Sequence, residues 1–388
     1  MSFELDHRAL MEQAHRGTGL DDFGDVQFEE PLGVLVDALT REARLDDTRR
    51  AQAEATLVSC LSKRLHLVQD RKTHPSIADE VITAPIFIVG LPRTGSTHLH
   101  ALLGQVEGVR TPLLWEIQLP SPPPDRETRY TDPRIAQVQA AVDQTPSELL
   151  VRHPVDPQRP EQCNGLSDWS FLDQTLLAPY EVPSYREWLF NADYSPAYVA
   201  HRRTLQHLQW RVPGRWVLKY PKHLLSLDAL LAEYPDARLI WTHRDPARVL
   251  PSVASLTGLM RSATPGYDPR RFGPEWVLLE ELCLRRGLDV RDRVAGALGR
   301  DIDVHYQDLM RDPVGTVNAI CSRAGILFAE TSRRNVERWV DEHPKTRHGV
   351  HRYRAEDFGL DRAALRRRFA FYIERFGVEL EASDGAAR

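Results

Sequence analysis

The first 80 residues carry apolar side chains at the spacing of one helix face. Leucine and valine recur three or four residues apart in two otherwise charged runs: Leu32, Leu35, Val36, Leu39 and Leu57, Val58, Leu61, Leu65. This period is typical of amphipathic helices. Asp46 and Asp47 precede the second run, where an acidic side chain can cap a helix. We therefore expect residues 1–82 to form a helical region that packs on a main domain.

Beyond Thr83 the pattern changes to short apolar runs that alternate with helical stretches. The run PIFIVG is rich in β-branched residues, as is usual in a buried parallel strand, and helix-spaced leucines follow it. Four segments are strand candidates of this kind: 85–90, 215–220, 237–244 and 301–306. Strands that alternate with helices predict an α/β fold, with a parallel sheet covered by helices on both faces. We assign residues 83–388 to this domain.

A long segment, residues 111–214, interrupts the alternation. It contains PSPPPD at 120–125, further prolines and many aromatic residues. Insertions at the carboxyl ends of parallel strands commonly build substrate pockets. We expect a lid over an apolar or aromatic acceptor, although the same rings would also suit simple packing or sugar stacking.

Composition and charge narrow the function classes. The chain has 50 Lys and Arg against 55 Asp and Glu, a formal charge of −5, whereas a nucleic-acid binder usually has a basic excess. The four cysteines form no C-x-x-C pair, the N-terminal residues lack the pattern of a secretory signal, and no apolar run approaches the ~20 residues of a membrane span. These features predict a cytoplasmic protein without a membrane span or a nucleic-acid partner.

The segment GLPRTGST at 90–97 joins the first strand candidate to its helix. Gly90 and Gly95 have the spacing of the phosphate-binding loop G-x-x-x-x-G-K-[ST], in which backbone N–H groups and a helix N-terminus attract an anion. Ser96 occupies the place of the lysine that contacts the phosphates of a nucleoside triphosphate. Arg93 lies inside the loop, and its guanidinium can hold two anionic oxygens. The loop therefore predicts an anion site that suits Mg·ATP poorly.

A second anion motif follows a later strand candidate. Arg244 stands at the end of the strand, Asp245 and Pro246 suit the start of a helix, and Ser252 comes eight residues after the arginine. An arginine and a hydroxyl donor are what a terminal phosphate requires.

Together the two motifs resemble those of the sulfotransferases that use 3′-phosphoadenosine 5′-phosphosulfate (PAPS). In that family a P-[KR]-[ST]-G-[ST]-[ST] loop holds the 5′-phosphosulfate, and an arginine and a serine eight residues apart hold the 3′-phosphate. The segments 216–223 and 348–360 are also similar to bacterial members, and the resemblance covers 85–378. It implies a P-loop-like α/β fold and in-line sulfuryl transfer from PAPS to a hydroxyl or amine of a small-molecule acceptor, with no metal required.

The resemblance also implies roles for individual residues. The 5′-phosphosulfate would contact Pro92, Arg93, Thr94, Gly95, Ser96 and Thr97, and the 3′-phosphate Arg244 and Ser252, with Arg352 and Tyr353 as lid contacts. Arg93 takes the place of a lysine of eukaryotic members and, because arginine stays protonated, would stabilise charge rather than donate a proton. Lys219 resembles the family's lysine near the sulfuryl group.

The general base stays open. Eukaryotic soluble members carry it in a K-T-H segment, and the matching segment here is Lys219-Tyr220-Pro221. Because a hydroxyl acceptor must lose its proton as the S–O bond forms, a histidine or carboxylate is expected nearby. His223 and Glu116 are the two main candidates, the second because heparan-type members use a carboxylate, and His98 is the third.

Two alternatives belong to other function classes. A P-loop kinase or NTPase would require ATP and Mg²⁺, and Ser96 in the lysine position argues against it. A nucleotide-binding protein without activity would fit the missing K-T-H histidine, but Arg93, Arg244 and Ser252 argue against it.

Overall fold

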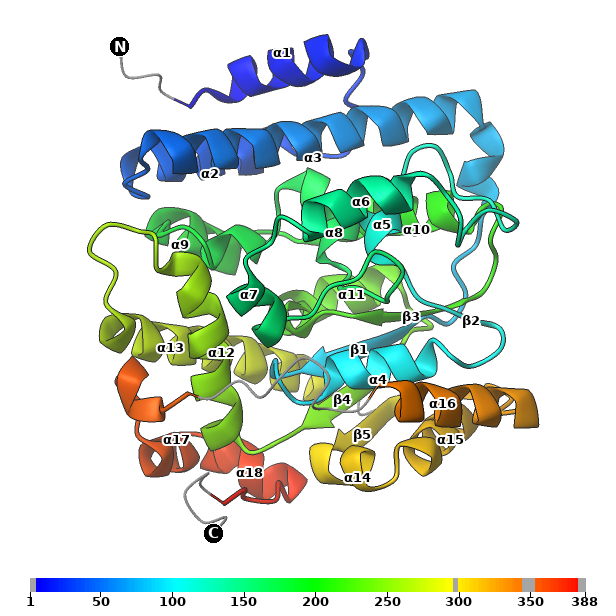
Figure 1. Ribbon diagram of the computed structural model, residues 1–388, viewed down its shortest axis with the longest axis vertical. Helices are drawn as coiled ribbons and strands as arrows, with labels where there is room; N and C mark the ends of the chain where they lie inside the picture. Colours follow the sequence, from blue (N-terminus) through cyan, green and yellow to red (C-terminus); the bar gives the residue numbers. More distant parts are fainter. Residues whose placement is uncertain (1–4, 296–298, 344–352, 383–388) are drawn as a thin grey trace.

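A five-stranded parallel sheet forms the centre of the computed structural model, which describes residues 5–295, 299–343 and 353–382 (Figure 1). The strands lie in the order β2-β3-β1-β4-β5. Their bounds are Ile86–Gly90 for β1, Val109–Arg110 for β2, Arg215–Lys219 for β3, Arg238–His243 for β4 and Asp301–His305 for β5. The α/β fold expected from the sequence is confirmed, and only the two-residue strand β2 was not expected, because two residues carry no periodic pattern.

Strand β1 occupies the middle of the sheet, with β3 on one side and β4 on the other. From β1 the chain goes first to β2 and β3 and then crosses to β4 and β5. Open parallel sheets bind ligands beyond the carboxyl ends of the strands at such a change of direction. The loop that follows Gly90 lies at this point.

Helices cover both faces of the sheet, because neighbouring side chains of a buried strand point to opposite sides. Ile86 and Ile88 pack in one apolar cluster, and Phe87 and Val89 pack in another. The first cluster is shared with α4 (Ser96–Leu103), α14 (Tyr306–Arg311), α15 (Pro313–Ala324) and α16 (Glu330–Glu342). The second is shared with α10 (Ser195–Gln209), α11 (Leu227–Glu233), α12 (Pro246–Arg261), α13 (Pro269–Val290) and the 3₁₀ turn η4 (Pro221–Ser226).

The N-terminal region is helical, as the periodicity predicts. It contains α1 (His7–Thr18), α2 (Glu29–Arg41), α3 (Asp47–Thr73) and the 3₁₀ turn η1 (Pro75–Asp79). The Asp46 side chain caps α3 by accepting a hydrogen bond from the Arg49 N–H at 2.8 Å. Leu57 and Leu61 of α3 belong to the same buried cluster as Phe87 of β1, so the N-terminal helices share the core of the α/β domain.

The insertion, residues 111–214, consists of short helices and irregular chain up to the start of α10. These are α5 (Leu114–Gln118), α6 (Arg134–Val142), α7 (Ser147–Arg152), α8 (Asn164–Ser167), the 3₁₀ turns η2 (Asp168–Ser170) and η3 (Thr175–Leu177), and α9 (Pro183–Asn191). Trp115, Trp169, Tyr185 and Tyr198 of this insertion are buried. Much of its aromatic content therefore serves packing, which is the simpler of the two readings the sequence allowed.

After β5 and its helices, the described chain ends with the 3₁₀ turn η7 (Ala355–Phe358), α17 (Arg362–Arg368) and α18 (Ala370–Phe376). These elements lie beside α12 and the carboxyl end of β4 (Figure 1). A π-helical turn, η5 (Arg291–Ala295), follows α13. Among the described residues, no helix combines the length and the apolar character that a bilayer crossing demands.

Candidate active site

The loop between β1 and α4 turns within a very small space. Gly90 has a φ of 128°, and a β-carbon there would lie 2.6 Å from the carbonyl oxygen of Thr242 on β4. Gly95 has a φ of 86° and directly precedes the first turn of α4. These are backbone conformations that favour glycine. The two glycines thus let the chain bring the N–H groups at the start of α4 to the carboxyl end of the sheet.

Thr94 stabilises this loop from inside. Its hydroxyl donates to the Leu91 carbonyl at 2.7 Å and lies 2.6 Å from the hydroxyl of Thr242, and the residue is fully buried. The side chain therefore connects the loop to β4. Because the hydroxyl is engaged in these contacts, the expected contact of Thr94 with an anion would be made by its backbone N–H.

A cavity of about 470 Å³ opens next to the loop, and we call it the donor cavity. It brings together the two anion motifs that lie 150 residues apart in sequence, and Lys219 joins them from the end of β3. Residues from these three places line it: Pro92, Arg93, Gly95, Ser96, Thr97, Lys219, Arg244 and Ser252. With Arg159 of the insertion, four cationic side chains line this cavity, and such a set suits a ligand with several negative charges.

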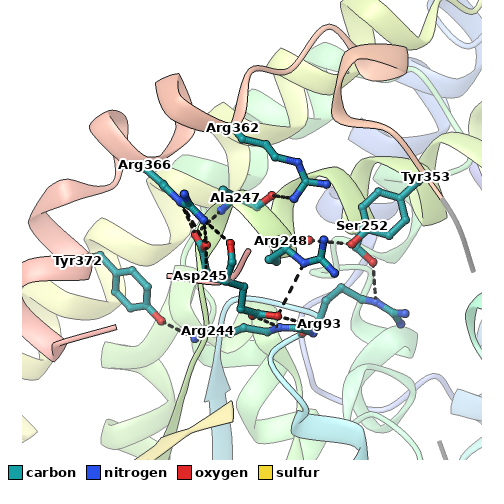
Figure 2. A network of polar contacts seen from close by, with 11 residues as sticks. Arg93, Arg244, Asp245, Ala247, Arg248, Ser252, Tyr353, Arg362, Arg366 and Tyr372 are labelled. Atoms are coloured by element: carbon teal, nitrogen blue, oxygen red, sulfur yellow. Dashed lines mark hydrogen bonds and ion pairs between the residues drawn. The ribbon is translucent and has the colours of Figure 1, made fainter. Parts of the chain in front are cut away.

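Hydrogen bonds link the two motifs directly, as Figure 2 shows. Arg93 Nε donates to the Ser252 hydroxyl at 3.2 Å, and Arg244 Nη1 donates to the Arg93 carbonyl at 3.0 Å. The Tyr353 hydroxyl donates to the carbonyl of Arg248 on α12 at 3.0 Å, so this expected lid residue lies close to Ser252. Arg352, the other expected lid contact, lies outside the described residues.

The guanidinium of Arg244 is already paired with a carboxylate. Its Nε and Nη2 donate to the two oxygens of Glu381 at 2.7 and 3.0 Å, and its other face lies 3.7 Å from the centre of the Tyr306 ring. Although burial alone would lower the pKa of Arg244, the Glu381 carboxylate raises it above its ordinary value. Arg244 thus presents a two-pronged donor to an oxyanion, the geometry that a phosphate also requires.

Asp245 joins the start of α12 to α17. Its buried carboxylate accepts from the Ala247 N–H at 2.9 Å, which caps α12, and from Arg366 Nη2 at 2.5 Å (Figure 2). The capping role agrees with the sequence. Arg366 was not among the site residues expected from the sequence.

Lys219 is almost fully buried at the floor of the donor cavity. Burial lowers its pKa, and the nearby Glu161 carboxylate partly offsets that effect. The structure therefore places the lysine expected near the sulfuryl group in the same cavity as the P-loop residues.

Glu116 is not a base in this cavity, which corrects one of the two main expectations. It is fully buried, and its oxygens accept from Arg110 Nη2 at 2.9 Å, Arg129 Nε at 2.9 Å and the Leu113 N–H at 2.9 Å. Burial would raise the pKa of Glu116, but the two guanidinium groups hold it below its ordinary value. A carboxylate with these partners is a poor proton acceptor, and its role is to hold the turn before α5.

His223, the other main candidate, lies behind the cavity. Its Nδ1 is 2.9 Å from the Tyr198 hydroxyl, and its ring packs edge-on against Phe87 at 5.3 Å. Burial lowers the pKa of His223 well below its usual range. Because the described lining of the cavity includes the neighbouring Pro221 but not His223, the expectation of a base at this position is also corrected. His98 does line the cavity, and its ring lies 5.2 Å from that of Trp339.

A second cavity of about 530 Å³ adjoins the first, and we call it the acceptor cavity. Leucine, valine and alanine side chains from the insertion and from α12 dominate its walls: Leu114, Ala141, Val142, Leu149, Val155, Ala178, Val253 and Leu256. Arg93, His153 and Gln162 line both cavities. The aromatic rings that suggested an apolar acceptor are mostly elsewhere, but the apolar character itself is present.

Sequence reasoning missed His153, Glu161 and Gln162. They occur in RHPVDPQRPEQ, an irregular stretch of the insertion with no strand, helix or glycine pattern. The available signal was a histidine and a carboxylate inside the segment expected to cover the substrate.

Comparison with known proteins gives one consistent result. The model of the sulfotransferase family matches residues 85–330. An omega-hydroxy-beta-dihydromenaquinone-9 sulfotransferase, Stf3 of Mycobacterium bovis, is 26% identical over 344 residues, which cover 84% of this chain and 83% of the relative. The crystal structure of sulfotransferase STF9 from Mycobacterium avium has a TM-score of 0.89 at 29% identity, covering 99% of this chain and all of that one.

A second crystal structure, of sulfotransferase STF1 from Mycobacterium tuberculosis, has a TM-score of 0.83 at 31% identity and covers 96% of this chain and all of the other. The family match includes the P-loop, Lys219, both cavity-lining helices α12 and α13, and the Arg244 motif. Because the family model covers more than half of the chain and the two crystal structures share its fold, the chain belongs to the sulfotransferase family, whose members are enzymes of sulfuryl transfer.

Proposed function

We propose that this enzyme transfers the sulfuryl group of PAPS to a hydroxyl group of an apolar small molecule. The observation that carries the proposal is the junction of the two cavities at Arg93. One cavity is cationic and built on the P-loop, and the other has apolar walls. A transfer enzyme needs its two substrates to meet at one point, and Arg93 lies there.

The donor cavity accounts for both charged ends of PAPS. The backbone N–H groups of Gly95, Ser96 and Thr97 would hold the 5′-phosphosulfate at the start of α4, where the helix dipole also favours an anion. Arg244 and Ser252 would hold the 3′-phosphate. This phosphate would take the place at Arg244 that the Glu381 carboxylate occupies.

The acceptor cavity favours a hydroxylated compound with an apolar body. Transfer of apolar surface from water stabilises binding by roughly 25 cal/mol per Å². Stf3 of M. bovis, which is similar to this chain, is named for a hydroxylated menaquinone. Both observations support an acceptor that buries hydrocarbon and presents one hydroxyl to Arg93.

The reaction would be an in-line displacement at sulfur. The acceptor oxygen forms a bond to sulfur while the bond from sulfur to the phosphate oxygen breaks, and the electron pair leaves with 3′-phosphoadenosine 5′-phosphate (PAP). Arg93, Lys219 and the loop N–H groups would stabilise the charge that collects on the phosphate oxygen. Because these groups can supply that stabilisation, we propose that turnover does not depend on a metal ion.

We also propose that the enzyme acts in the cytoplasm as a nucleotide-dependent protein with no nucleic-acid partner. Cys60, Cys163, Cys283 and Cys321 are all unpaired thiols, which supports a reducing compartment.

Titration calorimetry with PAP in the presence of a chelator tests the donor. We expect metal-free binding that weakens by about 10²-fold in Arg244→Ala, because a charged two-pronged contact is lost. Arg311→Ala is the matched control, since Arg311 is exposed on α14. Binding of ATP that requires Mg²⁺, with none of PAP, would overturn the proposal in favour of a P-loop kinase.

A further inference from the structure

His153 lies where the donor and acceptor cavities meet. It lines both, together with Arg93 and Gln162. Its side chain keeps 26% of its surface accessible, whereas the expected base Glu116 has none. This imidazole therefore lies at the junction where an acceptor hydroxyl from the apolar cavity would meet a sulfuryl group at the P-loop.

The P-loop itself fixes the position of His153. Arg93 Nη1 donates to the carbonyl of Arg152 at 3.1 Å, and Arg152 Nη1 donates to the carbonyl of Ser255 on α12 at 2.6 Å. The His153 N–H donates to the Leu149 carbonyl at 2.7 Å, which ends α7 at this residue. The imidazole is therefore one peptide unit away from a carbonyl that the P-loop arginine holds.

Glu161 faces His153 from the same segment of chain. Its Oε2 lies 3.7 Å from His153 Nε2, and its backbone N–H donates to the Pro112 carbonyl at 3.0 Å. Two residues further on, the Cys163 N–H donates to the Lys219 carbonyl at 3.0 Å. The segment 153–163 is thus attached at one end to the P-loop and at the other to the end of β3.

The negative charge of Glu161 suits a residue that supports His153 as a proton acceptor. Burial would raise the pKa of Glu161, but His153 and Lys219 lower it to about 2. The carboxylate is therefore ionised at any pH where the enzyme is expected to act. A fixed negative charge beside an imidazole stabilises the imidazolium that forms when the ring takes up a proton.

We propose that His153 is the general base of sulfuryl transfer and that Glu161 is its positioning residue. The proton leaves the acceptor hydroxyl for a nitrogen of the imidazole as the oxygen bonds to sulfur. The sulfur–oxygen bond to the phosphate breaks in the same step, and PAP departs with the electron pair. The proposal rests on the proposed function, and it fills the place of the base that the K-T-H comparison leaves vacant.

The test follows PAP release from PAPS with two acceptors, water and dodecan-1-ol, a primary alcohol with an apolar body. We expect His153→Ala to slow PAP release by about 10²- to 10⁴-fold, which is the usual contribution of general base catalysis. PAP affinity should stay within threefold of the wild-type value, because the P-loop and Arg244 remain. His66→Ala, at an exposed histidine of α3, is the matched control.

Added imidazole gives a second signature. It should restore part of the PAP release of His153→Ala and leave the rate of the wild-type enzyme unchanged, because it can enter the space left by the ring. An unchanged rate in His153→Ala, or a loss of PAP binding with no rescue, would overturn the assignment. If the wild-type protein neither binds PAP nor releases it from PAPS, the proposed function itself fails, and this result is distinct from both.

The positioning role of Glu161 is tested by comparing the effect of its substitution on kcat in the presence and absence of His153. Glu161→Gln should lower kcat by about 10-fold with little change in KM, and Glu161→Asp should recover part of the loss. In the double variant with His153→Ala, the second change should add almost nothing, since residues that act as a unit are not additive. An equal effect of Glu161→Gln in the presence and absence of His153 would show a structural role alone.

Discussion

The donor and acceptor cavities are neighbours of similar size, yet they are built in opposite ways. The donor cavity combines a backbone loop and charged side chains at the carboxyl ends of β1, β3 and β4 with residues 153–156 and 159–162 of the insertion. The acceptor cavity has mostly apolar walls from short helices of the insertion and from α12 and α13, with polar side chains such as Gln118, Asn164 and Lys222 between them. Because most residues that line one cavity do not line the other, a substitution can be directed at one ligand alone.

The difference has a physical basis. A phosphate is bound by directed hydrogen bonds that tolerate little displacement, so its donors must be fixed by the sheet. An apolar ligand is bound in proportion to the area it buries, without strong directional demands. Substitutions at the donor cavity should therefore affect every acceptor equally, and substitutions at the acceptor cavity should leave PAP binding unchanged.

Substitution of Arg93 should affect both cavities, and its effect should be larger than that of a substitution at Leu149 or Glu381. It lines both cavities and donates to Ser252 on the donor side and to the Arg152 carbonyl next to His153. We expect Arg93→Ala to slow PAP release from PAPS by about 10²- to 10³-fold, as for loss of a donor to a developing charge. The measurement is the rate of PAP release at saturating PAPS.

Two further variants show which property of Arg93 accounts for the slower PAP release. Arg93→Lys should recover a part of the rate, because it keeps the charge but has only one donor group. Arg126→Ala removes an exposed arginine of the insertion and should have no effect. A full rate in Arg93→Ala with weaker PAP binding would describe a nucleotide-binding residue rather than one that stabilises charge in the reaction.

The same contrast explains which parts of the site the sequence predicts. Gly90, Arg93 and Gly95 belong to one strand, loop and helix, and their function depends on local backbone conformation that spacing records. Arg244 and Ser252 lie on one strand end and the helix that follows. Because parallel strands end at the same edge of the sheet, the two motifs meet there without any further information.

The general base depends on the fold in a different way. Glu116 and Glu161 are both glutamates of the insertion, and nothing local distinguishes them. Burial between Arg110 and Arg129 removes the first from chemistry, whereas the hydrogen bond from the Glu161 N–H to Pro112 holds the second at the cavity. His223 is likewise lost to a buried cluster with Tyr198 and Phe87. These outcomes depend on tertiary contacts between segments of the chain, and no local sequence pattern predicts which segments meet.

A polar substitution at Leu149 should sharpen the comparison, with an intermediate effect. Leu149 lies on α7 and lines the acceptor cavity. Leu149→Asn replaces apolar wall with an amide, and we expect dodecan-1-ol to bind about 10-fold more weakly in the presence of PAP. PAP affinity should be unchanged, and both are measured by calorimetry.

Val151→Asn is the matched control, because Val151 is on the same helix but 42% exposed. It should leave both affinities unchanged. If Leu149→Asn weakened PAP binding as strongly as alcohol binding, the two cavities would act as one site, and PAP binding would not be independent of acceptor binding.

Glu381 should give the smallest effect, confined to the donor side. Its carboxylate pairs with Arg244 and lies 3.7 Å from Arg248 Nε, so a 3′-phosphate bound as proposed would displace a group of the same charge. Glu381→Gln removes that charge, and we expect PAP to bind about fivefold more tightly, since such partly exposed pairs contribute up to about 1 kcal/mol. Glu379→Gln, two residues earlier and exposed, is the control for net charge and should have no effect.

Weaker PAP binding in Glu381→Gln would contradict this prediction. It would mean that Glu381 orients Arg244 for the phosphate and that the ion pair between the two side chains persists when PAP is bound. Because the acceptor cavity has no part in this exchange, the affinity for dodecan-1-ol should be the same in all three proteins.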